Sequence, residues 1–149
     1  MTSSTPVLES IEALVSSHAS DGRVLDEAVR LLKENFAHYT WVGIYWVEEN
    51  ALVLRTYLGR PSPHTRIPIG KGICGAAVAE KRTVNVGDVN NDPRYLACPL
   101  ETRSEIVVPI QRDGRILGEI DIDSDSPNAF RGSDQQFLEA VASLLASRF

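Results

Sequence analysis

The chain has few of the residues that most often carry catalytic or metal-binding chemistry. Its 149 residues include two cysteines, Cys74 and Cys98, three histidines and one methionine. The cysteines stand 24 positions apart, a spacing that matches no zinc template of close ligand pairs. We therefore expect no metal and no other cofactor. Because sulfur is the one strong nucleophile here, the surroundings of the two thiols decide whether they react or only pack.

Positive charge and long apolar runs are also scarce. Acidic residues number 20 against 15 basic ones, so a net charge of -5 leaves no basic stripe for nucleic acid or an anionic membrane surface. No run approaches 18 apolar residues, and residues 1–6 lack the basic start of a signal peptide. We expect a cytoplasmic protein that contacts neither nucleic acid nor membrane, in which the thiols form at most a transient disulfide.

Hydrophobic residues make up 43% of the chain, enough for the core of one domain over residues 1–149. Apolar spacing predicts helices over 7–18, 24–38 and 73–81, and one that opens at a capping box in Ser133-Asp-Gln-Gln136. Segments rich in β-branched and aromatic residues predict strands at 41–47, 51–58, 66–69, 83–86, 104–111 and 116–123. The expected fold class is α+β, a mostly antiparallel sheet flanked by helices.

Each thiol has two interpretations. Cys74 follows Gly70-Lys71-Gly72 at a helix start, where free N–H groups and the lysine favour a thiolate. The alternative, a small buried apolar side chain, is the more common fate of a lone cysteine. Cys98 lies in the long 87–103 segment, expected to be a loop, and long loops in compact domains are usually functional. It is an exposed, mobile thiol or an incidental one, and the sequence does not decide between them.

Three acids on apolar strands are the next candidates. Asp121 and Asp123 share a face by the period of two, and facing the core they would hold a ligand's ammonium group. Facing outward they would be a solvated surface, which composition favours. Glu105 begins another apolar strand, where it is either a desolvated proton donor or a strand-end acid in water.

Aromatic residues and one histidine complete the set of candidates. Trp41 and Tyr45 are four apart on one strand and share a face, as core residues or as walls of a pocket. Aromatic residues on a hairpin belong more often to the core. His64 stands between prolines, and we expect it to be exposed rather than catalytic.

Six short segments are informative through their order and spacing along the chain. They are Trp41-Val-Gly-Ile-Tyr45, Arg66-Ile-Pro-Ile-Gly-Lys-Gly-Ile-Cys-Gly75, Asp88-Val89, Leu96-Ala-Cys98, Ser104-Glu-Ile-Val107 and Asp121-Ile-Asp-Ser124. Their combination resembles the free methionine-(R)-sulfoxide reductases, a branch of the GAF domain superfamily. The resemblance implies a GAF-like domain and reduction of free methionine sulfoxide. It departs from the family at His64, where many members carry a further cysteine, and at Pro99, where an acid often follows the nucleophile.

The resemblance also implies roles for the thiols. It makes Cys98 the nucleophile that attacks the sulfoxide sulfur and becomes a sulfenic acid. It makes Cys74 the resolving cysteine, whose disulfide with Cys98 a thioredoxin-like reductant would reduce. A homodimer is left open.

The remaining candidates take roles around the substrate. Glu105 would help to protonate the sulfoxide oxygen. The substrate-binding residues would be Trp41, Tyr45, Asp88, Asp121 and Asp123. The competing hypothesis is a GAF module that binds a small molecule or acts as a sensor, without chemistry.

Overall fold

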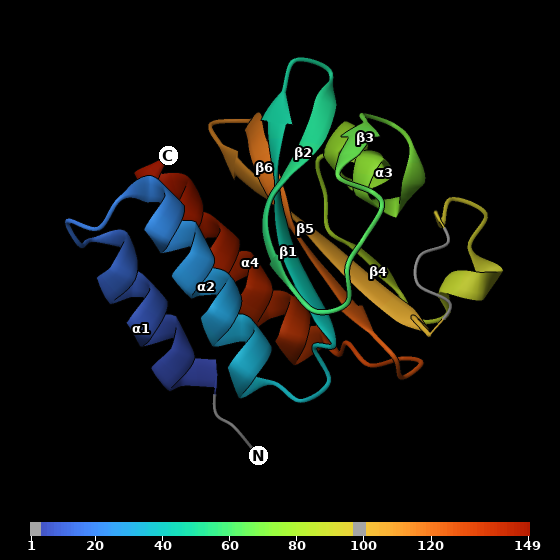
Figure 1. The fold of residues 1–149 in the computed structure, drawn as a ribbon, viewed down its shortest axis with the longest axis horizontal. Coiled ribbons are helices and arrows are strands. Elements are labelled where there is room, and N and C mark those ends of the chain that lie inside the picture. The colour runs from blue at the N-terminus through green and yellow to red at the C-terminus, as the bar shows by residue number, and fades with distance from the viewer. Residues whose placement is uncertain (1–3, 97–100) are drawn as a thin grey trace.

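Six strands and five helical segments make up the part of the chain that the computed structural model describes, residues 4–96 and 101–149 (Figure 1). The helices are α1 (Ser4–Val15), α2 (Asp21–Asn35), α3 (Gly72–Glu80) and α4 (Gly132–Arg148), with a short 3-10 helix η1 (Val89–Asn91). The strands are β1 (Trp41–Glu48), β2 (Ala51–Leu58), β3 (Arg66–Pro68), β4 (Val84–Val86), β5 (Ser104–Arg112) and β6 (Arg115–Ser124).

The strands form one sheet in the order β3-β2-β1-β6-β5-β4, with every neighbouring pair antiparallel. The two expected hairpins, β1-β2 and β5-β6, are both present, and they meet where β1 pairs with β6. The expected α+β fold with an antiparallel sheet is therefore confirmed.

The two faces of the sheet have different partners. Helices α1, α2 and α4 lie together on one face, and α3 lies on the other (Figure 1). Strand β6 serves both faces by alternation, since Ile120 and Ile122 belong to the core beneath the three helices. The carboxylates of Asp121 and Asp123 point the other way, toward α3. The larger apolar core thus supports the strands from one side only.

The helix ends differ from the sequence expectation because apolar spacing locates a helix face more securely than its ends. Helix α2 begins at Asp21 rather than near residue 24, since the Ser20 side chain accepts a hydrogen bond from the backbone N–H of Arg23 at 3.3 Å. The expected capping box at Ser133 is wrong. Helix α4 begins at Gly132, and the Asp134 carboxylate instead accepts from the backbone N–H of Arg131 at 2.9 Å.

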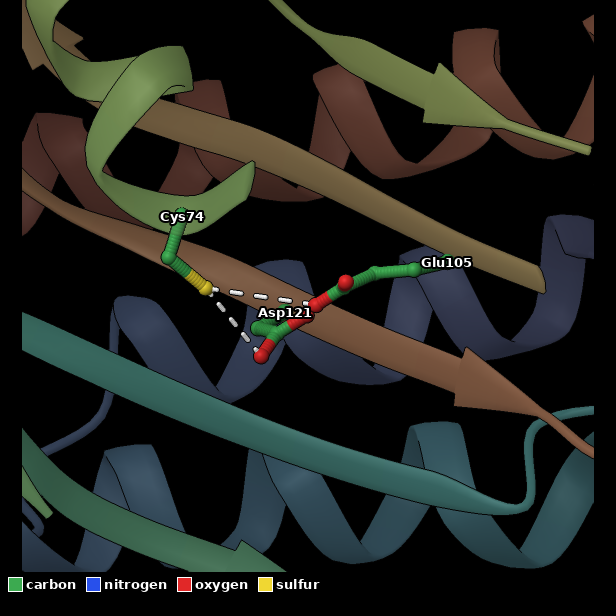
Figure 2. A group of neighbouring side chains, drawn as sticks. All are labelled: Cys74, Glu105 and Asp121. Atoms are coloured by element: carbon green, nitrogen blue, oxygen red, sulfur yellow. Dashed lines mark hydrogen bonds between the residues drawn. The ribbon is translucent and has the colours of Figure 1, made fainter. Parts of the chain in front are cut away.

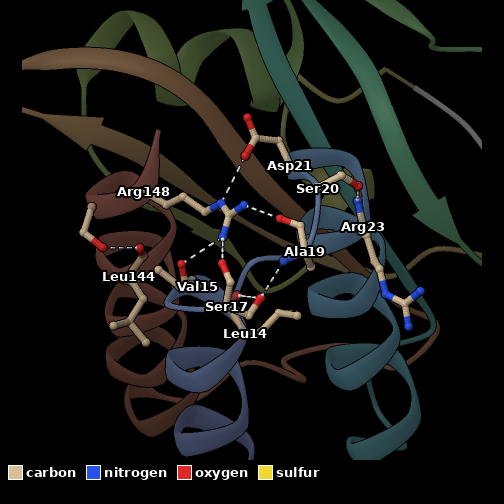
Figure 3. Close-up of polar contacts among 10 residues, drawn as sticks. Leu14, Val15, Ser17, Ala19, Ser20, Asp21, Arg23, Leu144 and Arg148 are labelled. Carbon is tan, nitrogen blue, oxygen red and sulfur yellow. Dashed lines mark hydrogen bonds and ion pairs between the residues drawn. The ribbon is translucent and has the colours of Figure 1, made fainter.

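A single arginine joins the end of α4 to the α1-α2 turn (Figure 3). The guanidinium of Arg148 donates to the backbone carbonyls of Val15, Ser17 and Ala19 and pairs with Asp21 at 3.1 Å. These bonds satisfy the carbonyl of Val15, the last residue of α1, and two carbonyls of the turn that follows it. Within residues 4–96 and 101–149, no helix combines the length and apolar character needed to cross a bilayer.

Candidate active site

Helix α3 carries Cys74 into the space above the sheet. The helix can pack closely against the loop that precedes it because its fourth residue, Gly75, is glycine. A Cβ on Gly75 would lie 2.8 Å from the backbone nitrogen of Gly70 and 2.9 Å from the carbonyl oxygen of Pro68. The loop before α3 therefore closes onto the helix, with the Gly70 N–H donating to the Gly75 carbonyl at 3.0 Å. Cys74 is buried, with 5% of its surface exposed.

Strands β5 and β6 place three acids beside Cys74, on the face of the sheet that α3 covers. Glu105 is the cross-strand partner of Asp123, and Asp121 lies one pleat further along β6 on the same face. All three are buried, with exposed fractions of 6%, 8% and 5% respectively. The expectation that Asp121 and Asp123 form a solvated surface is therefore wrong: both face the α3 side. Glu105 is desolvated, as in the first of its two interpretations.

Cys74, Glu105 and Asp121 point toward one another (Figure 2). The Cys74 thiol donates to Asp121 Oδ2 at 3.3 Å and lies 4.0 Å from Glu105 Oε2. One ligand atom from each of the three residues lies within 4.8 Å of the others. The three residues come from α3, β5 and β6, which are separated in sequence and meet only in the fold.

A cavity opens beside this cluster. It is lined by Trp41, Tyr45, Ser62, His64, Ile67, Gly72, Ile73, Cys74, Tyr95, Leu96, Glu105, Asp121 and Asp123. Oδ1 of Asp121, Oδ1 of Asp123 and Nε2 of His64 are buried and have no hydrogen-bond partner among the described residues. Buried polar atoms without partners are costly, so these three indicate that a polar ligand or water satisfies them.

Burial determines the protonation of the cluster. It is the largest cause that raises the pKa of Glu105 well above its usual range, and the charges of Asp121 and Asp123 raise it further. Burial also raises the pKa of Asp121, against hydrogen bonds from Glu105 and Cys74 and the charge of His64. Glu105 is therefore suited to hold a proton at neutral pH.

Burial and neighbouring acids also raise the pKa of the Cys74 thiol well above its usual range. The expectation that the start of α3 favours a thiolate is therefore wrong. Loss of solvation on burial is the largest cause, and the charges of Asp121, Glu119 and Glu105 add to it in a buried space where charge interactions are stronger. Cys74 is held as a neutral thiol, and it is buried as its alternative interpretation predicts.

The two aromatic candidates are both buried and both line the cavity. Trp41 Nε1 donates to the carbonyl of Arg60 at 3.0 Å, and the Tyr45 hydroxyl donates to the carbonyl of His64 at 2.7 Å. These bonds fix the rings and tie the 59–65 segment over the pocket. Core and pocket wall are thus the same residues.

One other predicted site residue lies away from the cavity, and another falls outside the described residues. Asp88 is not among the lining residues, and its carboxylate caps η1 by accepting from Asn90 and Asn91, each at 3.1 Å. Its role in substrate binding stays a prediction. Cys98 lies outside the described residues. Tyr95 and Leu96, which precede it closely, line the cavity.

The sequence analysis missed two residues near the site. His64, expected to be exposed, is half-buried and lines the cavity, because Tyr45 holds its backbone against the pocket. Glu119 is fully buried, and its two carboxyl oxygens have no hydrogen-bond partner among the described residues. The period of two that joins Asp121 to Asp123 extends back to Glu119 and was the available signal.

Known proteins share this architecture along nearly the whole chain. A family model described as the GAF domain matches residues 22–149. The free methionine-R-sulfoxide reductase of Saccharomyces cerevisiae is 40% identical, over 92% of this chain and 84% of that protein. The enzyme of that name from Escherichia coli is 34% identical, over 89% of this chain and 80% of that protein.

A solved structure gives the same result in three dimensions. The X-ray structure of free methionine-R-sulfoxide reductase from Neisseria meningitidis in complex with its substrate is 40% identical and superposes with a TM-score of 0.92. The match covers 98% of this chain and 87% of that one. The chain therefore belongs to the GAF domain family, in the branch that contains the free methionine-R-sulfoxide reductases.

Proposed function

We propose that the protein reduces free methionine-(R)-sulfoxide to methionine. The observation that carries this proposal is the buried group of Glu105, Asp121 and Asp123, which lines a cavity beside a thiol and in which one oxygen each of Asp121 and Asp123 has no hydrogen-bond partner among the described residues. The relatives that bear this activity in their names match nearly the full chain. The protein is accordingly an oxidoreductase that acts on a sulfur group.

The carboxylates select a free amino acid. Asp121 and Asp123 bind the substrate's ammonium group, which supplies the hydrogen-bond donors and the positive charge that their buried oxygens lack. A methionine sulfoxide residue within a peptide has no such ammonium group, and its binding would leave the carboxylates unpaired. Trp41 and Tyr45 form the apolar walls around the thioether carbons.

Cys98 carries out the first chemical step. Its sulfur attacks the sulfoxide sulfur as a thiolate, the thiol proton having passed to solvent, while Glu105 gives its own proton to the sulfoxide oxygen. The oxygen passes to Cys98, so methionine leaves and Cys98 becomes a sulfenic acid; the sulfoxide is reduced by two electrons and Cys98 is oxidised by two. Tyr95 and Leu96 bring the chain to the cavity edge just before Cys98.

Cys74 then resolves the sulfenic acid. Its thiol condenses with the sulfenic acid of Cys98 to give a disulfide and one water molecule. Glu105 and Asp121 are placed to take the Cys74 proton. A thioredoxin-like dithiol reduces the disulfide in a reducing compartment, the cytoplasm. Cys74 is the other cysteine of the chain, which makes it the resolver in this proposal.

Single turnover tests the proposal. Reduced protein in excess should convert free methionine-(R)-sulfoxide to one equivalent of methionine, and it should leave the S epimer and a blocked peptide sulfoxide unchanged. Absence of methionine from the R epimer would contradict the proposal. The alternative, a GAF module that only binds a small molecule, requires ligand affinity without product.

Two matched substitutions separate the thiols. Cys98→Ser should abolish methionine formation. Cys74→Ser should retain the first turnover and lose recycling by thioredoxin, with a sulfenic acid trapped by dimedone and detected by mass spectrometry. The reverse pattern would make Cys74 the nucleophile.

A further inference from the structure

We propose that Cys74, Glu105 and Asp121 form a binding site for a thiophilic divalent cation, of which Zn²⁺ is the type, in the reduced protein. The cation would occupy the space that the substrate's ammonium group needs and would bind the thiol that resolves Cys98. The site is therefore inhibitory with respect to the proposed reductase. Its existence rests on the geometry of the three residues and not on that activity.

The separations of the donor atoms suit a tetrahedral ion. Zinc bonds of about 2.3 Å to sulfur and 2.0 Å to oxygen place a sulfur and an oxygen ligand about 3.5 Å apart. Cys74 Sγ lies 3.3 Å from Asp121 Oδ2 and 4.0 Å from Glu105 Oε2, on either side of that value. The three donor atoms lie within 4.8 Å of one another, so small rotations of the side chains suffice (Figure 2).

Unpartnered atoms at the same place indicate a cationic ligand independently. Asp121 and Asp123 are more than nine-tenths buried, and Oδ1 of each faces the cavity without a hydrogen-bond partner among the described residues. Nε2 of His64 is also unpartnered and lies on the same cavity. The three clustered donors, one sulfur and two oxygens, belong to the ligand types that bind zinc.

The sulfur donor of Cys74 favours a metal ion over an ammonium group as the occupant of this site. An ammonium group gains its stabilisation from carboxylate oxygens alone, whereas a thiolate selects zinc and other soft or borderline cations over Mg²⁺ and Ca²⁺. Binding is an exchange without oxidation: the Cys74 sulfur loses its proton to solvent and forms a bond to the metal. A carboxylic acid in the cluster that binds the metal releases its proton in the same way.

Titration with the metal alone tests the site. Reduced, chelator-treated protein is titrated with Zn²⁺ by calorimetry, and with Co²⁺ as a spectroscopic probe. We expect one equivalent to bind, protons to be released, and Co²⁺ to show the near-ultraviolet charge-transfer absorption of a thiolate ligand. If the wild-type protein lacks that absorption, the proposal is overturned, and this result does not depend on the folding of any variant.

Matched variants locate the site. Loss of an outer-shell partner alone weakens metal sites about 10–100-fold, so Cys74→Ser should weaken Zn²⁺ binding by at least about 100-fold. Asp121→Asn should weaken it in the same direction. Cys98→Ser, and Asp26→Asn at an exposed acid of α2, should bind as the wild type does. Circular dichroism verifies that each variant is folded. Wild-type affinity in Cys74→Ser, or loss in Cys98→Ser, would overturn the assignment.

Competition separates this proposal from the proposed function. Saturating free methionine-(R)-sulfoxide should raise the apparent dissociation constant for Zn²⁺ in the Cys98→Ser protein, which cannot consume it. Unchanged zinc affinity would overturn the inference that zinc and the sulfoxide exclude each other from the cavity. Intact zinc binding in a wild-type protein that fails single turnover would overturn the reductase proposal and leave the metal site standing.

Discussion

Glu105 differs from an ordinary carboxylic acid because of what surrounds it. It lies between Ser104 and Ile106 on β5, opposite Asp123 and close to Asp121, and burial is the main cause that raises its pKa. An acid needed to protonate an oxygen must carry its proton at working pH, and burial beside other acids favours the protonated form of Glu105.

The first prediction concerns Glu105→Gln. The substitution keeps the shape and removes the transferable proton, so the single-turnover rate at neutral pH should fall about 10²–10⁴-fold. In the wild type the rate should decline as pH rises through the raised pKa of Glu105, and the variant should lack that limb. Rapid-quench assays of methionine formation measure the single-turnover rate and its pH profile. A variant with wild-type rate and the same pH profile would remove Glu105 from the chemistry.

Helix α3 depends on its contact with the preceding loop. Gly75 permits that contact, because any side chain there would meet the backbone of Gly70 and Pro68 rather than a movable side chain. The contact determines how deeply Cys74 enters the space above β5 and β6. An element of nine residues is thus positioned by the absence of one methyl group.

The second prediction is Gly75→Ala. Backbone must shift to admit the Cβ, so the free energy of unfolding should fall by about 1–3 kcal/mol. Because α3 carries Cys74, recycling by thioredoxin should slow more than the first turnover. Gly22→Ala is the matched control, since a Cβ at Gly22 meets nothing within 4 Å. Chemical denaturation and steady-state assays measure the two effects. Equal stability and equal recycling rates in the two variants would contradict the proposed importance of the contact between Gly75 and the preceding loop.

The third prediction concerns the attachment of α1 and α2 to α4. Arg148→Met keeps an apolar stem and removes the hydrogen bonds to the Val15, Ser17 and Ala19 carbonyls, so it should cost about 2–3 kcal/mol. Hydrogen exchange should quicken first in α1 and its following turn. Arg23→Met, at an exposed arginine of α2, should change stability by less than about 0.5 kcal/mol.

At the scale of the whole molecule, one face of the sheet is apolar and the other carries a concentrated set of buried acids. Glu105, Glu119 and Asp123 have pKa values raised well above the usual range, with burial as the largest cause, and the pKa of Asp121 is raised too. The folded protein therefore binds protons that the unfolded chain at neutral pH does not.

The fourth prediction follows from that difference. The stabilising contribution of these acids is fully present below their unfolded pKa of about 4 and is lost as pH rises through their raised folded-state values. The ligand-free protein should unfold at a higher temperature at pH 5.5 than at pH 8.5. Glu119→Met should reduce that difference and stabilise the protein at pH 8.5 by about 1–4 kcal/mol. Calorimetry across pH measures both, and a melting temperature that rises with pH would contradict the prediction.

The sequence predicted elements better than environments. Alternation on β6 placed Asp121 and Asp123 on one face, yet nothing local to the strand said which face was buried, since that depends on α3 packing from residues 72–80. Helix ends were missed because Ser20 and Asp134 act through side-chain geometry. The Cys74, Glu105 and Asp121 cluster escaped spacing templates because its members come from three elements.

The alternation of β6 has a consequence for evolvability. Ile120 and Ile122 belong to the large core, whereas Asp121 and Asp123 line the cavity, so neighbouring positions have different structural roles. Substitutions that share no contacts act nearly independently on stability. A lineage can therefore alter what the cavity accepts while the helices on the opposite face keep the scaffold folded. Alternate positions of one strand thus serve the scaffold and the site, and each set can change while the other is kept.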